Sequence, residues 1–222
     1  MAEKASVPVA TVLDHGMSYE DCMRAIRLGC TSVMFDGSSL PMEENIRITR
    51  EIVKIAHAVG VSVEGEIGHV GGVEGGATLE GAEVDESAYS TPEEARYFAE
   101  ETGVDALAVA IGTVHGTFKG TPKLDIERLK DIRKAVGALP LVLHGGSGLP
   151  VEEFRKAIAN GINKINIFTS SERAGAESAK RLFDNAEKYV VTFDQIARDA
   201  VGPMQEDVEK HIEIFETTSI AN

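Results

Sequence analysis

Six short, almost entirely apolar runs recur along the chain, and many of their residues are β-branched. They occupy residues 8–13, 32–35, 61–63, 105–111, 139–143 and 164–167. Apolar residues follow one another in these runs instead of alternating with polar ones. This pattern is typical of strands that are buried on both faces of a parallel sheet.

Amphipathic stretches with helical spacing lie between these runs. Within residues 42–58, one apolar stripe consists of Ile46, Thr49, Ile52, Val53 and Ala56. Thr91, followed by Pro92 and Glu94, predicts a helix start with a capping box. Four glycines are each expected to end a helix: Gly29, Gly60, Gly103 and Gly137. The sixfold alternation of strand and helix predicts an α/β barrel.

Two segments depart from this alternation. Residues 68–90 are acidic and rich in glycine, which predicts a loop, and we expect a mobile one. After Thr169 the chain is mostly helical, and Gly202 with Pro203 is the clearest predicted break in this tail. No linker divides the sequence, so we expect a single domain over residues 1–222 with a helical tail from about residue 171.

Composition and charge limit the classes of partner. With 36 acidic and 22 basic residues, the net charge of −14 would repel nucleic acid and anionic membrane surfaces. No apolar run approaches the roughly 20 residues of a membrane helix, and the first residues lack the apolar centre of a signal peptide. Two cysteines, Cys22 and Cys30, are too few for a disulfide scaffold. We expect a cytoplasmic protein that binds neither nucleic acid nor membrane.

Side chains capable of chemistry follow nearly every predicted strand. They are Asp14, His15, Asp36, Glu64, Glu66, His115, His144 and Asn166. In an α/β barrel the carboxyl ends of the strands converge on one face, where the active site lies. We therefore expect these side chains to share one site.

Three of the six histidines precede a glycine at such a strand end: His15, His115 and His144. Three imidazoles that leave a coordination position open are typical of a catalytic zinc ion or a similar divalent ion. A hydrogen bond to a neighbouring loop would explain any one of these histidines alone, but not their shared context. His57 and His211 fall within helical stretches and are predicted not to be ligands, and for His69 a surface position fits best.

Glycine provides a second signal. Gly145, Gly146, Ser147 and Gly148 directly follow a strand, and a helix is predicted to start near Pro150. Backbone N–H groups in such a turn can bind an anion, although tight strand-to-helix turns also use glycine. Phosphate sites of barrels often use the last two loops.

Asp14, beside a predicted ligand, would act as a general acid or base or would orient an imidazole. Together these features suit enolate chemistry on a phosphorylated carbonyl compound.

Eight segments carry motifs that occur together in one enzyme family. They are 7–16 (VPVATVLDHG), 32–38 (SVMFDGS), 43–46 (EENI), 61–66 (VSVEGE), 71–72 (GG), 102–116 (TGVDALAVAIGTVHG), 122–125 (PKLD) and 141–148 (LVLHGGSG). On these segments the chain resembles the class II, zinc-dependent ketose-bisphosphate aldolases, the fructose- and tagatose-bisphosphate aldolase family. The resemblance extends from residue 7 to about residue 170 and implies a TIM-type (β/α)8 barrel.

The resemblance implies roles for individual residues. Asp14 resembles the proton donor, and Glu74 resembles the loop glutamate that takes part in proton transfer at the ketose carbon. Glu64 and Glu66 match paired glutamates near the metal. The implied ligands of one zinc ion are His15, His115 and His144. The implied contacts of dihydroxyacetone phosphate are Gly116, Gly145, Gly146, Ser147, Asn166, Ile167, Phe168 and Thr169. Relatives also use a monovalent cation, which the resemblance allows here.

The chain departs from the family pattern at its front. Relatives have two further β-α units before the strand at residue 8, where only seven residues stand here. We therefore expect an open six-stranded sheet that is poorly stable or associates, as a dimer or tetramer. Val12 replaces a frequent histidine, and Glu74 precedes Gly75 where an aspartate is usual.

Three functions stay open at this point. Asp36, Gly37 and Ser38 resemble the fructose-type enzymes, so cleavage of fructose 1,6-bisphosphate to dihydroxyacetone phosphate and glyceraldehyde 3-phosphate is the first prediction. Tagatose-bisphosphate cleavage is an alternative. The other alternative is an impaired relative that binds metal and sugar phosphate without efficient turnover.

Overall fold

The computed structural model describes residues 4–72, 81–186 and 190–217. Its main sheet has six parallel strands in the order β1-β2-β3-β5-β7-β8. The strands are β1 (Val12–Gly16), β2 (Ser32–Phe35), β3 (Ser62–Ile67), β5 (Ala106–Val109), β7 (Leu141–Leu143) and β8 (Ile162–Ile165). A separate small sheet pairs β4 (Gly71–Gly72) with β6 (Val114–His115).

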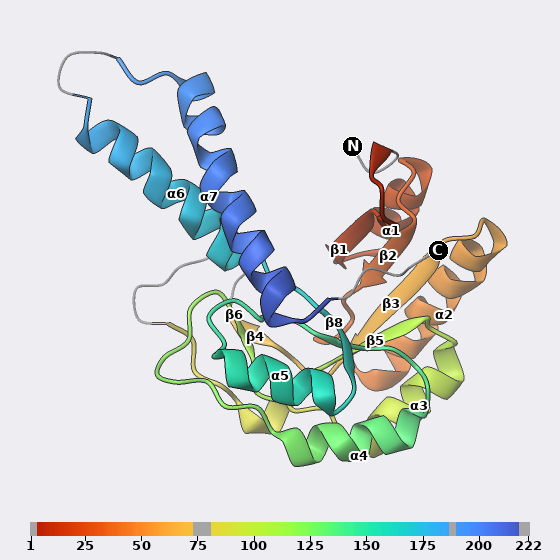
Figure 1. Cartoon of the computed structure of the whole chain (residues 1–222). Helices are drawn as coiled ribbons and strands as arrows, with labels where there is room; N and C mark the ends of the chain where they lie inside the picture. The colour runs from red at the N-terminus through yellow and green to blue at the C-terminus, as the bar shows by residue number, and fades with distance from the viewer. Residues whose placement is uncertain (1–3, 73–80, 187–189, 218–222) are drawn as a thin grey trace.

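Helices alternate with the strands of the main sheet and lie around its outside (Figure 1). They are α1 (Tyr19–Arg27), α2 (Met42–Ala58), α3 (Pro92–Thr102), α4 (Ile126–Val136) and α5 (Val151–Ala159), with a short 3-10 turn, η2 (Glu86–Ala88), before α3. The last two helices, α6 (Thr169–Asp184) and α7 (Phe193–Ile214), form an antiparallel arm that projects from the sheet. Among the helices of the described residues, none is both long and apolar enough to cross a membrane.

The sheet is strongly curled. Asp14 lies in β1 and Asn166 directly follows β8, so five strand spacings separate them. In a flat sheet that separation would be about 24 Å. Asn166 Nδ2 instead lies 2.9 Å from Asp14 Oδ2, which is possible only because the carboxyl ends of the strands converge across the hollow of the sheet. In the described residues, β1 pairs only with β2 and β8 only with β7, so the expectation of an open six-stranded sheet is confirmed.

Local signals in the sequence set several helix boundaries. The predicted helix at residues 42–58 is α2. The capping box at the start of α3 is present, since Thr91 Oγ1 accepts a bond from the Glu94 amide at 3.2 Å and Glu94 accepts one from the Thr91 amide at 3.0 Å. Gly103 ends this helix with a left-handed φ of 70°, a conformation that glycine adopts without strain.

Three strands depart from their predicted ranges. The strand predicted at 61–63 extends to Ile67, because β5 pairs with it from Glu64 onward, so Glu64 and Glu66 lie within β3 and do not follow it. The other two strands are displaced. The run at residues 8–13 becomes a strand only from Val12, because its neighbour β2 begins at Ser32, the pairing partner of Val12. The predicted strand at 164–167 starts earlier, at Ile162, which pairs with Leu141 at the start of β7. An apolar run shows where side chains can be buried. A strand forms only where the backbone can also hydrogen-bond to a neighbouring strand.

The predicted break at Gly202 and Pro203 is wrong, because α7 continues through both residues. Proline lacks the N–H that would bond the carbonyl of Asp199, four residues earlier. That carbonyl instead accepts a bond from Ser178 Oγ of α6 at 3.0 Å. A neighbouring helix thus satisfies the group that proline leaves without a partner, and the arm stays helical there.

Gly65 in β3 is predicted to tolerate no side chain. A Cβ at this position would lie 2.6 Å from Cε1 of Phe98, which is fully buried. We expect Gly65→Ala to lower the free energy of unfolding by about 1–3 kcal/mol through overpacking, measured by urea denaturation. Gly202→Ala is the control: nothing lies within 4 Å of its Cβ position, and alanine in a helix should raise stability by about 0.5–1 kcal/mol. An unfolding free energy of Gly65→Ala at or above that of the unsubstituted chain would contradict this account.

Candidate metal and phosphate site

The end of β1 brings two consecutive side chains to one place. Between two aligned pairs, β1 has one residue more than β2, so Asp14 and His15 together face Met34. His15 has a φ of 50°, in the left-handed region that is uncommon for residues other than glycine. In a regular strand these two side chains would point to opposite faces. The bulge lets Asp14 reach Asn166 and lets His15 reach His144 on the same side.

The three predicted histidines lie together. The centroids of their rings are 4.8 Å apart for His15 and His115, 4.7 Å for His15 and His144, and 6.0 Å for His115 and His144. One ring nitrogen from each lies within 4.8 Å of the others. His115 comes from β6 and not directly from the end of β5, so the small second sheet completes the cluster.

Carboxylates orient two of these rings. His15 Nδ1 lies 3.0 Å from Asp36 Oδ2, and His144 Nε2 lies 2.8 Å from Glu64 Oε1. An ionised carboxylate only accepts hydrogen bonds, so each outer ring nitrogen carries the proton. The inner nitrogens, His15 Nε2 and His144 Nδ1, lie 2.9 Å apart and can both offer lone pairs to a cation. This is the arrangement in which an imidazole binds a metal.

The same contacts keep the two carboxylates ionised. Burial acts to raise the pKa of Asp36, but the hydrogen bond from His15 contributes to holding that pKa well below its usual range. Burial likewise acts to raise the pKa of Glu64, while the bond from His144 and the charge of Lys164 lower it overall. Both side chains are therefore acceptors at neutral pH.

His115 and Glu66 are neutral for the same reason, burial. Burial lowers the pKa of His115 to about 4, and the electrostatic effect of a proton shared with the neighbouring rings of His15 and His144 would lower it further. Burial also raises the pKa of Glu66 to about 8, and the charge of Asp36 adds to this effect. A deprotonated imidazole is ready to act as a ligand, and a cation nearby would return Glu66 to its ionised form.

The donor set fits a divalent ion. Besides the three histidines, His15, Asp36 and Glu66 also offer ligand atoms within 4.8 Å of one another. Glu66 Oε2 is buried and has no hydrogen-bond partner among the described residues. A buried carboxylate oxygen in that position is costly unless a cation or a proton satisfies it. Imidazoles with a nearby carboxylate are ligands that suit zinc and other borderline ions.

A cavity of about 500 Å³ lies beside the histidines. Its lining consists of Asp14, His115, Gly116, Gly145, Ser147, Ile165, Asn166, Ile167, Phe168 and Thr169. All of the predicted substrate contacts are therefore in its wall except Gly146. The amide of Gly146 donates to the carbonyl of Asn166 at 3.2 Å, which ties the two loops of this wall together.

The wall of this cavity that the glycine loop forms has the features of an anion site. Gly145 has a φ of 65°, and a Cβ there would lie 2.5 Å from the carbonyl oxygen of Val114. Ser147 Oγ accepts bonds from the amides of Phe168 and Ser170 at 3.3 and 3.2 Å. These contacts hold the glycine loop against the first turn of α6. The N-terminus of a helix beside a glycine-rich turn presents N–H groups and a positive dipole to a phosphate.

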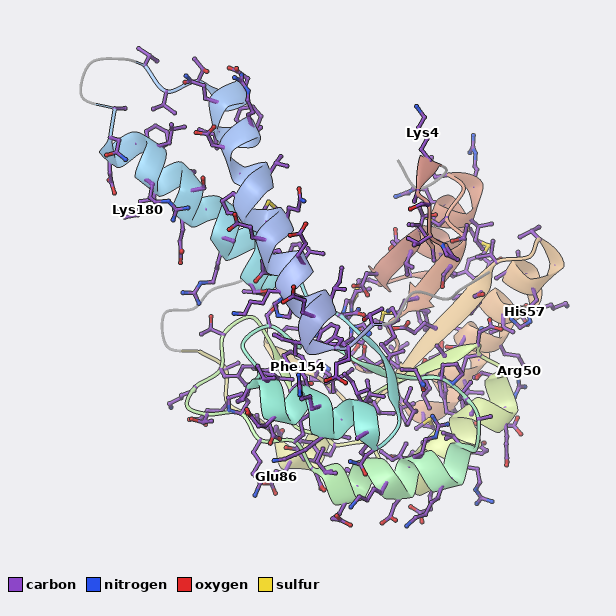
Figure 2. The ribbon with its side chains drawn as sticks, viewed as in Figure 1. Lys4, Arg50, His57, Glu86, Phe154 and Lys180 are labelled. Carbon is purple, nitrogen blue, oxygen red and sulfur yellow. The ribbon has the colours of Figure 1, made fainter. Side chains whose placement is uncertain are left out.

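The remaining predicted residues lie elsewhere. Glu74 falls outside the described residues. His57 stands on the outer surface at the end of α2, where it pairs with Asp105 at 2.9 Å (Figure 2). His211 packs against the ring of Phe154, and His69 lies 3.3 Å from Ser38 Oγ. None of these three histidines belongs to the candidate metal groups found among the described residues.

Sequence reasoning placed Asp36 among the side chains of the site without a specific role, and it gave Lys164 no place there. Asp36 holds His15, and Lys164 binds Glu64. The position of Asp36 at a strand end was a usable signal. For Lys164, the signal is a charged residue in a run that was predicted to be a buried strand, where a charge needs a partner.

Comparison with known proteins places this geometry in context. A family model described as fructose-bisphosphate aldolase class-II matches residues 1–219. A fructose-bisphosphate aldolase of Staphylococcus aureus is 42% identical over 207 residues, which are 93% of this chain and 68% of the relative. One of Geobacillus stearothermophilus is 48% identical over 177 residues, 80% of this chain and 60% of the relative.

Solved structures give the same result. The YdjI aldolase from Escherichia coli K12 superposes with a TM-score of 0.81 at 38% identity, over 97% of this chain and 72% of that one. A putative fructose-1,6-bisphosphate aldolase from Coccidioides immitis gives a TM-score of 0.84 at 33% identity, over 97% and 74%. Each relative is longer than this chain.

Metal binding should depend on the clustered histidines and not on the surface one. We expect one divalent ion per chain by elemental analysis after dialysis. His144→Ala removes a ligand atom and should release most of that ion, whereas His57→Ala, a histidine variant outside the cluster, should retain it. Equal metal content in the two variants would show that the three imidazoles are not the binding site.

Proposed function

The chain belongs to the class II fructose-bisphosphate aldolase family, and from this premise we propose that it cleaves fructose 1,6-bisphosphate reversibly to dihydroxyacetone phosphate and glyceraldehyde 3-phosphate with one zinc ion. Enzymes of this family are metal-dependent carbon–carbon lyases. The observation that carries the proposal is the convergence of three imidazoles, the Asp14 carboxylate and a glycine-lined cavity at one end of the sheet.

In this proposal His15, His115 and His144 hold the ion. Zinc is the proposed metal because three neutral imidazoles that leave a position open are its usual catalytic ligand set. When bound, the ion polarises the substrate carbonyl as a Lewis acid. Asp36 and Glu64 keep two of the imidazoles in the tautomer that binds.

Asp14 is the proposed acid–base residue. Its carboxylate lines the cavity, and Asn166 Nδ2 donates to both of its oxygens, at 3.0 and 2.9 Å. In the cleavage direction Asp14 would take the proton of the hydroxyl group that becomes the aldehyde oxygen, and in synthesis it would return that proton. The proton transfer at the ketose carbon is assigned to Glu74 by the resemblance alone.

The phosphate of the dihydroxyacetone half is proposed to bind at the wall of the cavity that the glycine loop and the start of α6 form. Gly145, Gly146 and Ser147 come from the loop after β7, and Asn166 to Thr169 lead into the first turn of α6. Backbone amides in these loops would bind the phosphate oxygens. A protein with a net charge of −14 can bind such an anion because these amides act locally.

A second candidate is binding of metal and sugar phosphate without efficient turnover. The open edges of the described sheet favour it, because a sheet that is not closed holds the two walls of a site less rigidly. Tagatose 1,6-bisphosphate is an alternative substrate, because the orientation of one hydroxyl group depends on pocket details.

The zinc-loaded protein should release dihydroxyacetone phosphate from fructose 1,6-bisphosphate in a coupled assay, faster than from tagatose 1,6-bisphosphate. Asp14→Asn should keep its zinc and lose about 10²- to 10⁴-fold in turnover, the usual worth of general acid–base catalysis. His57→Ala is the control and should match the unsubstituted chain. Bound zinc with no product would favour the second candidate, and near-normal turnover of Asp14→Asn would remove its assigned role.

We also propose that the chain forms a homo-oligomer. Three apolar side chains are exposed near the open edge of the sheet: Val12 at the start of β1, and Val7 and Val9 in the segment that precedes this strand. An exposed apolar edge strand is prone to pair with another chain.

The oligomer should be visible by size-exclusion chromatography with light scattering as a dimer or tetramer. Val9→Lys with Val12→Lys should shift it toward the monomer, because lysine on an edge strand opposes pairing. Val59→Lys changes a valine that is more exposed than Val9 or Val12 but lies after α2, and it should have no effect. A monomer at every concentration would contradict the proposal.

A further inference from the structure

One charged side chain on the inner face of the sheet has no part in the proposed function. Lys164 lies in β8, and its Nζ is 2.8 Å from Glu64 Oε2. Glu64 lies in β3 and is 2% exposed. Its other oxygen, Oε1, is 2.8 Å from His144 Nε2. Ammonium, carboxylate and imidazole therefore form a continuous chain across the hollow of the sheet.

The ammonium group stabilises a carboxylate that would otherwise be costly to bury. A buried carboxylate needs a cation or several hydrogen-bond donors. In the described residues, the ion pairs of Glu64 are those with Lys164 and His144. Lys164 occupies Oε2 and so fixes the plane of the carboxylate, which leaves Oε1 directed at the imidazole.

The orientation of His144 depends on that carboxylate. Because Glu64 accepts the proton on Nε2, Nδ1 keeps its lone pair and faces His15 Nε2 at 2.9 Å. A ring that loses this anchor can turn about its side-chain bonds, and its ligand atom then leaves the cluster. The position of Nδ1 thus depends on a lysine three strands away from Glu64 in the order of the sheet.

A role of Lys164 as a nucleophile does not fit its surroundings. A Schiff base requires a neutral amine that faces the substrate. The amine of Lys164 is engaged by the Glu64 carboxylate, and the cavity is lined by Ile165 and Asn166 but not by Lys164.

We propose that Lys164 is a positioning residue for metal binding, which acts through Glu64 on the ligand atom of His144. This inference rests on the proposed function, in which His144 is a metal ligand. Outer contacts of this kind typically change metal affinity by 10- to 100-fold.

The test is zinc affinity of the metal-free full chain, measured by competition with a chromophoric chelator. Lys164→Met keeps the length of the side chain without its charge, and should weaken zinc binding about 10- to 100-fold. Lys164→Arg should restore affinity to near that of the unsubstituted chain. Lys156→Met is the matched control, because Lys156 pairs with Glu153 at 2.7 Å in α5, and it should leave zinc binding unchanged.

A double-mutant cycle separates positioning from general stability. If Lys164 acts through Glu64, then Lys164→Met added to Glu64→Gln should weaken zinc binding no further. Thermal unfolding of each metal-free variant shows whether it is folded, and Lys164→Gln, which still offers a hydrogen bond to Glu64, serves if Lys164→Met does not fold. Unchanged zinc affinity in a folded variant, fully additive effects, or failure of both variants to fold would overturn the proposal.

The result of the zinc-affinity test can be distinguished from a failure of the proposed aldolase function. If zinc binding responds as expected but no ketose bisphosphate is cleaved, the positioning role stands and the aldolase activity does not. Borohydride reduction in the presence of dihydroxyacetone phosphate, followed by mass spectrometry, tests whether Lys164 acts as a nucleophile. A covalent adduct on Lys164 would overturn both the positioning role of Lys164 and the proposed zinc-dependent function.

Discussion

The geometry of the candidate site depends on two bonds of the buried Glu64 carboxylate. This carboxylate joins β3 to the loop after β7 and to β8, through bonds of 2.8 Å to His144 and Lys164. Such bonds require the sheet to curl, because strands this far apart in a flat sheet would hold these groups too far from one another. The geometry of the site therefore depends on the curvature of the sheet. The bonds of the buried Glu64 carboxylate stabilise the site and the curved sheet together.

Curvature alone does not complete the site, because β1 also needs an irregular residue. The bulge at Asp14 and His15 directs two neighbouring side chains to the same face, at the cost of a left-handed φ at His15. Such strain is found where the surrounding structure fixes it and function requires it. Here it places the carboxylate of Asp14, the proposed acid–base group, next to the imidazole of His15, two groups that a regular strand would separate.

The α6–α7 arm contributes Thr169, the first residue of α6, to the wall of the cavity. The first turn of α6 is held to the glycine loop by Ser147, and Asp207 of α7 accepts bonds from the hydroxyls of Ser170 and Ser171 at 2.8 and 2.6 Å. The arm projects away from the sheet (Figure 1), yet its base positions the loop at which phosphate is proposed to bind. The helical tail, to which the sequence assigned no role beyond its first residue, thus helps to form the candidate site.

The sequence by itself determined the alternation of strands and helices, the capping of α3 and the residues that gather at the carboxyl ends, because apolar periodicity, capping and strand-end polarity are local. It also carried the family motifs. It did not determine where β1 and β8 begin, since a ladder needs its neighbour, or that α7 runs through Pro203, since Ser178 comes from another helix. Only the tertiary structure decided that Asp36 and Glu64 orient the histidines and that Lys164 anchors Glu64, because those contacts join residues up to 100 positions apart through the curvature of the sheet.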